Sequence, residues 1–250
     1  MGEALLGGLV AAGWDASDLG VVEPVERRRV DLAERFLGLT TGAEALAADG
    51  AVLSVKPADV VAAATAAAGA GTGRLLSIAA GVPLATIEAV TGSRPVVRAM
   101  PNTPALIGAG AAAIAPGAHA GEDDLAWAEE LLGAVGVVVR VAEPLLDAVT
   151  GLSGSGPAYL FLVAEALIEA GVLVGLPRDV ATELTVQTMV GSARLLAEGD
   201  VGPEALRAAV TSPGGTTAAG LRVLEDRGVR AAVLAAVAAA AERSTELGRR

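Results

Sequence analysis

The first half of the chain alternates short apolar runs with longer stretches in which apolar residues recur at the period of a helix. The runs predict strands, and the stretches between them predict helices. We expect strands at residues 19–22, 51–55, 75–79 and 95–99, and helices at residues 3–12, 25–36, 58–68 and 84–90. Such alternation indicates an α/β layer with a parallel sheet. Ile114 and residues 137–141 are expected to add strands near its end.

After about Pro144 the alternating strand pattern stops, and helical periods bordered by proline and glycine replace it. We expect helices at residues 156–174, 178–198, 203–210, 216–225 and 229–247. The sequence therefore predicts two domains, residues 1–144 with the sheet and residues 145–250 with helices only. The stretch Tyr159–Val174 is apolar around most of its circumference, so it should be buried on several sides. Intertwined dimerisation would bury it, and so would a plain helical bundle.

Composition and charge narrow the function. The 250 residues carry a net charge of −11, which argues against nucleic acid as a partner. Without cysteine there are no disulfides or thiolate metal sites, and the single His119 rules out histidine clusters, so we expect no metal. The apolar runs Ala158–Leu176 and Val233–Ala241 are too short or too interrupted to span a membrane. With no secretory pattern at its start, the protein is expected in the cytoplasm.

The sheet pattern opens with a helix where a dinucleotide-binding fold has a strand and a glycine-rich turn. Gly2 would be the last glycine of that turn, at the helix end that faces a pyrophosphate. Glu23 follows about 20 residues later, at the end of the next strand, where an acid can bind the ribose. A helix cap and a surface glutamate would explain both residues equally. Either the natural chain starts further upstream, or the sheet lacks a central strand.

Three segments with candidate chemistry follow expected strands. They are Val55–Pro57, which holds the only lysine, Ser77–Gly81 with small residues, and Arg98–Pro104 with two prolines. In doubly wound sheets ligands bind beyond the carboxyl ends of the strands. A surface lysine, tight packing and a rigid turn are the plainer explanations.

Two further segments, Leu152–Pro157 and Thr211–Thr217, combine glycine with hydroxyl residues ahead of expected helices. The free N–H groups of a helix N-terminus favour an anion, although a serine N-cap explains the first segment equally well. The second would hold a carboxylate, with Arg207 as the only nearby arginine. His119 and the acidic residues of 122–130 are expected on the surface.

Taken together, these segments resemble pyrroline-5-carboxylate reductases over nearly the whole chain. The most specific match is Ala209–Leu221, and the others are residues 55–57, 79–81, 100–104 and 147–159. The resemblance implies a Rossmann-like parallel-sheet domain followed by an all-helical dimerisation domain that interlocks with a partner subunit in a dimer or a ring of dimers. It implies hydride transfer from NADPH or NADH to the C=N carbon of 1-pyrroline-5-carboxylate, giving L-proline.

The resemblance and the spacing together give candidate site residues. The cofactor-lining set is Gly2, Glu23, Pro24, Ser54, Val55, Lys56, Pro57, Ala79, Ala80 and Gly81. The substrate-binding set is Gly215, Thr216, Thr217 and Asp200, with Thr217 as the candidate catalytic hydroxyl near the ring nitrogen. Glu23 favours NADH, whereas Arg27, Arg28 and Arg29 favour NADPH, the cofactor that the family implies.

Reduction of an imine suits this residue set. A cyclic imine arrives already protonated, so the protein mainly supplies position and electrostatics and needs no histidine, cysteine or carboxylate pair. Two alternatives remain. One is a different reductase on the same scaffold, although a 3-hydroxy-acid enzyme would want a lysine in the helical domain, which has none. The other is an inactive helical oligomer that does not bind the cofactor.

Overall fold

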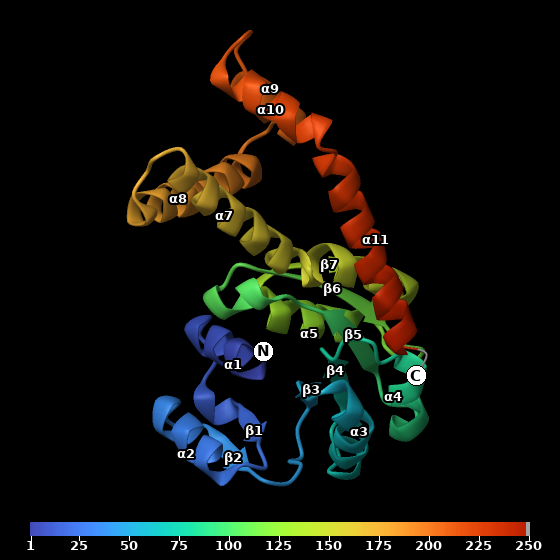
Figure 1. The fold of residues 1–250 in the computed structure, drawn as a ribbon. Coiled ribbons are helices and arrows are strands. Elements are labelled where there is room, and N and C mark those ends of the chain that lie inside the picture. The colour runs from blue at the N-terminus through green and yellow to red at the C-terminus, as the bar shows by residue number, and fades with distance from the viewer. Residues whose placement is uncertain (249–250) are drawn as a thin grey trace. The chain divides into compact units, whose positions relative to one another are not determined.

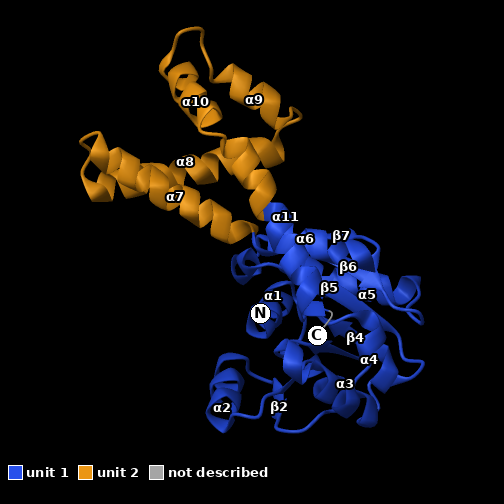
Figure 2. Cartoon of the chain, turned by 45° about the vertical axis from the view of Figure 1, so that its right-hand side comes forward, with its two compact units in different colours: residues 1–155, 237–250 blue, residues 156–236 orange. Residues whose placement is uncertain are grey.

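A computed structural model describes residues 1–248 (Figure 1). By its internal contacts the chain divides into two compact units, residues 1–155 with the segment from Val237 onward, and residues 156–236 (Figure 2). The division falls later than the expected boundary at 144/145. The segment between the two positions packs on the sheet of the first unit, where Leu146 is buried against Ala113 and Ala115.

The larger sheet of unit 1 has five strands in the order β3-β4-β5-β6-β7. These strands are β3 Gly50–Leu53, β4 Arg74–Ser77, β5 Val96–Met100, β6 Gly110–Pro116 and β7 Gly136–Arg140. The pairs β3–β4, β4–β5 and β6–β7 are parallel, as predicted, whereas β6 runs antiparallel to β5. Only the short 3₁₀ helix η3 Thr103–Ile107 connects β5 to β6, and a connection without a crossover helix allows an antiparallel pair.

Helices cover both faces of this sheet. They are α1 Gly2–Ala11, α3 Val60–Gly69, α4 Leu84–Thr91, α5 Glu122–Gly133 and the short α6 Leu146–Val149. Successive strand residues point to opposite faces. Leu75 therefore packs in the cluster with α3 and α4, while Leu76 packs in the cluster with α1 and α5. Burial on both faces explains why these strands read as continuous apolar runs.

A second, two-stranded parallel sheet pairs β1 Gly20–Val22 with β2 Thr40–Gly42. It packs with α2 Glu26–Arg35 through a separate small cluster of Leu6, Leu32 and Leu39. Within residues 1–248, β1 pairs only with β2, and β3 pairs only with β4. The strands that the sequence placed in one layer thus form two sheets, and β2 was not predicted.

Unit 2 contains α7 Gly156–Leu173, α8 Arg178–Glu198, α9 Pro203–Ala209, α10 Thr216–Asp226 and the first part of α11 Val229–Gly248. Helices α7 and α8 form a hairpin, closed by Gly175 at a φ of 104°. Of residues 156–236 only Ala181 is fully buried. The apolar side chains of α7 are therefore uncovered within one chain, among them Leu160, Phe161 and Leu162.

Helix α7 begins at Gly156, as expected, but the chain is already helical ahead of it, so that one helical stretch runs from Glu143 to Leu173. A π-helical turn, Thr150–Gly154, connects α6 to α7, and the Ser155 N–H donates to the Thr150 carbonyl at 2.8 Å. The longer stretch also corrects the membrane expectation, since it is long and apolar enough to cross a membrane by length and composition alone. One such helix is weak evidence, because apolar helices of soluble proteins pass the same test.

Candidate active site

Three parallel strands end together at one edge of the larger sheet. Leu53 of β3 pairs with Ser77 of β4, which pairs in turn with Arg98 of β5. The segments that follow, residues 54–57, 78–83 and 101–102, therefore lie along the same carboxyl edge. This is the edge at which open α/β sheets bind their ligands.

The N-terminus of α1 meets this edge at Ser54. A methyl group at Gly2 would lie 2.5 Å from the Ser54 Oγ, so only glycine permits the approach. The first N–H groups of α1 have no partner inside the helix and carry its positive dipole end. Gly2 and Ser54, predicted separately, are thus neighbours.

The residues after Ser54 lie on the surface. Val55, Lys56 and Pro57 are exposed, and Pro57 begins a short 3₁₀ helix, η2 Pro57–Asp59, for which Lys56 is the N-cap residue. Within the described residues Lys56 forms no ion pair. Its ammonium group can therefore meet a ligand anion.

The second edge segment is the loop between β4 and α4. Its Ala79 is buried, Ala80 is exposed, and Gly81 has a φ of 73°. At Gly81 a methyl group would lie 3.4 Å from the Leu247 Cβ of α11. The loop ends at Leu84, whose N–H donates to the Glu143 Oε1 at 2.7 Å.

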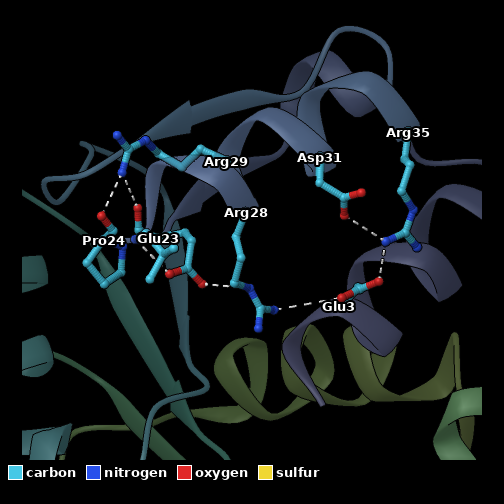
Figure 3. A network of polar contacts seen from close by, with 8 residues as sticks. Glu3, Glu23, Pro24, Arg28, Arg29, Asp31 and Arg35 are labelled. Atoms are coloured by element: carbon cyan, nitrogen blue, oxygen red, sulfur yellow. Dashed lines mark hydrogen bonds and ion pairs between the residues drawn. The ribbon is translucent and has the colours of Figure 1, made fainter.

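Glu23 lies just beyond β1 and is held from several sides (Figure 3). Its Oε1 accepts the Val25 N–H at 3.0 Å, and its Oε2 lies 3.3 Å from the Arg28 Nε. Arg29 donates to the carbonyl oxygens of Glu23 and Pro24 at 2.8 and 2.9 Å. The carboxylate is therefore fixed in position, and its charge is offset in part by Arg28, which also lies 3.8 Å from the Glu3 carboxylate.

Helix α7 begins at Gly156 directly after the π-helical turn Thr150–Gly154, so it does not offer the free helix end that an anion site or a serine N-cap needs. The Ser153 hydroxyl donates back to the Val149 carbonyl at 3.1 Å. Asn102 donates to the Ser153 carbonyl at 3.1 Å and accepts the Ala111 N–H at 2.8 Å. Asn102 therefore joins two segments that the sequence treated as separate, and its position between two prolines gave no sign of this.

The substrate candidates lie in unit 2, at the start of α10. Gly215 is the N-cap residue and no side chain caps this helix, so its first N–H groups are free to meet a ligand. The Gly215 N–H closes a turn on the Ser212 carbonyl at 3.0 Å, and Gly214 has a φ of 67°. Thr216 is exposed and Thr217 is half-buried in the first helical turn. This arrangement can hold a carboxylate.

Two neighbouring residues do not join this group. The Arg207 guanidinium lies 3.8 Å from the Glu225 carboxylate. The backbone carbonyl of Arg207 accepts a hydrogen bond from the Thr211 hydroxyl at 2.6 Å. Asp200 is exposed in the turn between α8 and α9, and it forms no hydrogen bond or ion pair with residues 215–217.

Comparisons with known proteins show the family of the chain. The family model "Pyrroline-5-carboxylate reductase dimerisation" matches residues 143–247. The pyrroline-5-carboxylate reductase of Mycobacterium tuberculosis is 47% identical, over 99% of this chain and 93% of the relative. The enzyme of Corynebacterium melassecola is 42% identical, over 100% of this chain and 96% of the relative.

Solved structures give the same result. The pyrroline-5-carboxylate reductase of Coxiella burnetii superimposes with a TM-score of 0.92 at 36% identity, covering 98% of this chain and 94% of that chain. The Plasmodium falciparum enzyme, solved with NADP bound, superimposes with a TM-score of 0.86 at 30% identity, covering 99% of this chain and 94% of that chain. The chain therefore belongs to the pyrroline-5-carboxylate reductases, the oxidoreductases that reduce 1-pyrroline-5-carboxylate to L-proline with a nicotinamide cofactor.

Proposed function

We propose that this reductase holds its cofactor along the carboxyl edge of β3 and β4, and the carboxylate of its substrate at the first turn of α10. The observation that carries the cofactor half is the close approach of Gly2 to Ser54. The observation that carries the substrate half is the N-terminus of α10 after Gly215, which no described side chain caps. The two halves lie in different units.

On the cofactor side, the first N–H groups of α1 would hold the pyrophosphate. Residues 54–57 would lie along one side of the dinucleotide and residues 79–81 along the other. Within residues 1–248 the N–H groups of Ala80 and Gly81 form no hydrogen bond, which leaves them for the ligand. When bound, the cofactor supplies the hydride that reduces the C=N carbon.

On the substrate side, the N–H groups of Thr216 and Thr217 would bind the carboxylate, and the Thr217 hydroxyl would face the ring nitrogen. This nitrogen is already protonated in the free imine, so the residues only need to orient it and stabilise its charge. Asp200 remains a weaker candidate for the same end of the site.

Substitution of Thr217 tests the substrate half. Thr217→Ala should raise the KM for pyrroline-5-carboxylate by about tenfold, the loss of one hydrogen bond to a charged group, and leave the KM for NADPH unchanged. Thr217→Ser keeps the hydroxyl and should retain most of the activity. Unchanged substrate kinetics in the alanine variant would refute the role of Thr217.

We further propose NADPH as the preferred cofactor, with NADH also used. Glu23 would normally favour a 2′-hydroxyl, but its charge is offset by Arg28. Arg29 adds a second cation beside it, and Arg27 forms no ion pair within the described residues. Arginine side chains at the end of β1 suit a 2′-phosphate. Arg27→Ala should lower kcat/KM for NADPH and leave that for NADH unchanged, and an equal loss for both would contradict the preference.

A second copy of the chain is the proposed cover for the apolar faces of unit 2. The family's dimerisation model spans these helices. Phe161 of α7 is 64% exposed, and an uncovered apolar surface of this kind marks an interface. A lipid environment is disfavoured, since Glu165 and Glu169 would then be costly. Light scattering should show a dimer or a ring of dimers, and Phe161→Glu should shift it toward monomer. A monomeric parent protein would overturn this proposal.

The alternative of an inactive oligomer predicts that the chain does not bind the cofactor. The proposed function predicts instead that titration of the 250-residue chain with NADPH, followed by nucleotide fluorescence, shows saturable binding. If neither nicotinamide cofactor binds, the proposed cofactor site is wrong. The cytoplasmic location expected from the sequence stays a prediction, which cell fractionation would test.

A further inference from the structure

The loop at residues 78–83 carries part of the proposed cofactor site but has few polar restraints of its own. The N–H groups of Ala80 and Gly81 have no hydrogen-bond partner within residues 1–248. The loop is anchored by the burial of Ala79 and Val82, which are 4% and 8% exposed, and by a long hydrogen bond of 3.5 Å from the Ala79 N–H to the Ser77 Oγ. Its position must therefore be fixed by the elements on either side.

Glu143 fixes the end of the loop. Its Oε1 accepts the Leu84 N–H at 2.7 Å, at the first residue of α4. The same oxygen accepts the Arg98 Nη1 at 3.0 Å, and the Arg98 side chain is only 10% exposed. Hydrogen bonds to a charged group are roughly twice as strong as neutral ones. The carboxylate thus joins the start of α4 to β5 at the carboxyl edge of the sheet.

Asp147 fixes the other side of the loop through α11. Its Oδ1 accepts the Ser244 hydroxyl at 2.7 Å, and its Oδ2 accepts the Thr245 hydroxyl at 2.8 Å. Ser244 is 4% exposed, so this contact is largely shielded from water. The two bonds hold the last turns of α11 where Leu247 lies against Gly81.

We infer that the segment Glu143–Val149 is a brace that positions the cofactor loop. Glu143 acts on its exit into α4, and Asp147 acts on Gly81 through the end of α11. Neither carboxylate is placed against the cofactor, so both are positioning residues. The inference rests on the proposed function, in which residues 79–81 line the cofactor.

Glu143→Gln and Asp147→Asn test the brace with little change of shape. Hydrogen–deuterium exchange of the cofactor-free protein should show faster exchange for the peptide at residues 78–84 in both variants. The Kd for NADPH, from fluorescence titration, should rise about tenfold, the loss of one charge-assisted hydrogen bond. The KM for pyrroline-5-carboxylate at saturating NADPH should stay within about twofold.

Glu129→Gln is the matched control, because it removes a glutamate–arginine pair between α5 and β7 in the same unit. It should leave both the exchange of the loop and the Kd for NADPH unchanged. A change in the control as large as in Glu143→Gln would mean general destabilisation and would overturn the brace. If the two carboxylates act on one loop, the double variant should weaken NADPH binding by less than the product of the single effects.

A substitution in the loop itself separates this inference from the proposed site. Ala80→Asp puts a negative charge on the exposed part of the loop and should weaken NADPH binding strongly. If it does not, the loop does not line the cofactor, and both the site and the brace are wrong. If it does, while Glu143→Gln and Asp147→Asn bind NADPH as the parent does, the site stands and the brace alone is refuted.

Discussion

Gly215→Ala tests the substrate half of the site by a purely steric change. Gly215 has a φ of −75°, which alanine adopts freely, so the backbone itself is not strained. The added methyl group would, however, lie 2.4 Å from the Ser212 Oγ and 3.2 Å from the Ser212 carbonyl oxygen. Either the Ser212 hydroxyl or the turn that presents the first N–H groups of α10 must therefore move.

The size of the effect follows from these distances. An ordinary contact is at least about 3.4 Å, so the turn or the hydroxyl must move by about 1 Å, a displacement that can reduce a rate by about a hundredfold. Part of it can be absorbed by rotation of the Ser212 side chain. We therefore expect kcat/KM for pyrroline-5-carboxylate to fall between about tenfold and a hundredfold. The loss of stability should be no more than about 1 kcal/mol, the difference between glycine and alanine at an N-cap.

Steady-state kinetics with each reactant varied in turn is the assay. The KM for NADPH should stay unchanged, and the double variant Ser212→Ala/Gly215→Ala should recover most of the activity, because the nearest atom is removed. Gly69→Ala, in α3, makes the same change where no atom lies within 4 Å, and it should have no kinetic effect. Parent-like substrate kinetics in Gly215→Ala, or no recovery in the double variant, would refute the reasoning.

Three further predictions concern the framework of unit 1. Arg94→Lys should lower the free energy of unfolding, measured by urea titration, by about 1–3 kcal/mol. The Arg94 guanidinium donates to three carbonyl oxygens near the ends of α3 and α4, and an ammonium group cannot reach all three together. Gly50→Ala should change tryptophan fluorescence, since the methyl group would lie 2.4 Å from the Trp127 Cζ2. Hydrogen bonds from Arg140 lower the pKa of Glu129, so this carboxylate stabilises the fold above its ordinary pKa and loses that effect as the pH falls through the lowered value. Acid unfolding of Glu129→Gln should lack this contribution.

The sequence predicted the elements of unit 1 well where burial governs the pattern. Leu75 and Leu76 face opposite sides of the sheet, and both are fully buried, so the strand appears as an uninterrupted apolar run. The strand β2, Thr40–Gly42, was missed because its residues carry no apolar signal and its pairing with β1 is made by the backbone. The rule that ligands bind at strand carboxyl ends then placed the candidate cofactor segments correctly along one edge.

The site details that were missed depend on contacts between distant residues. Helix α7 begins at Gly156 as predicted, but the π-helical turn Thr150–Gly154 that leads into it was missed. Gly154 permits this turn because a methyl group would lie 2.6 Å from the Met100 Cε, and the Asn102 amide holds the Ser153 carbonyl. Met100 and Asn102 are far from Gly154 in the sequence, so the local pattern of residues 150–157 could not reveal these contacts. In the same way, spacing placed Glu23 at the end of β1 but could not show that Arg28 offsets its charge.

For the apolar helix α7 the sequence pattern alone cannot predict the environment. The same residues would suit a protein core, a lipid bilayer or an interface with a second chain. Of residues 156–236 only Ala181 is buried, so unit 2 has too little core to be stable on its own. If a second copy covers it, folding and association are coupled, and stability must depend on protein concentration. The thermal midpoint should rise steadily over a hundredfold increase in concentration, and Phe161→Glu should lower it and flatten the dependence. A midpoint that is independent of concentration, together with full activity at the highest dilution, would show that one chain suffices.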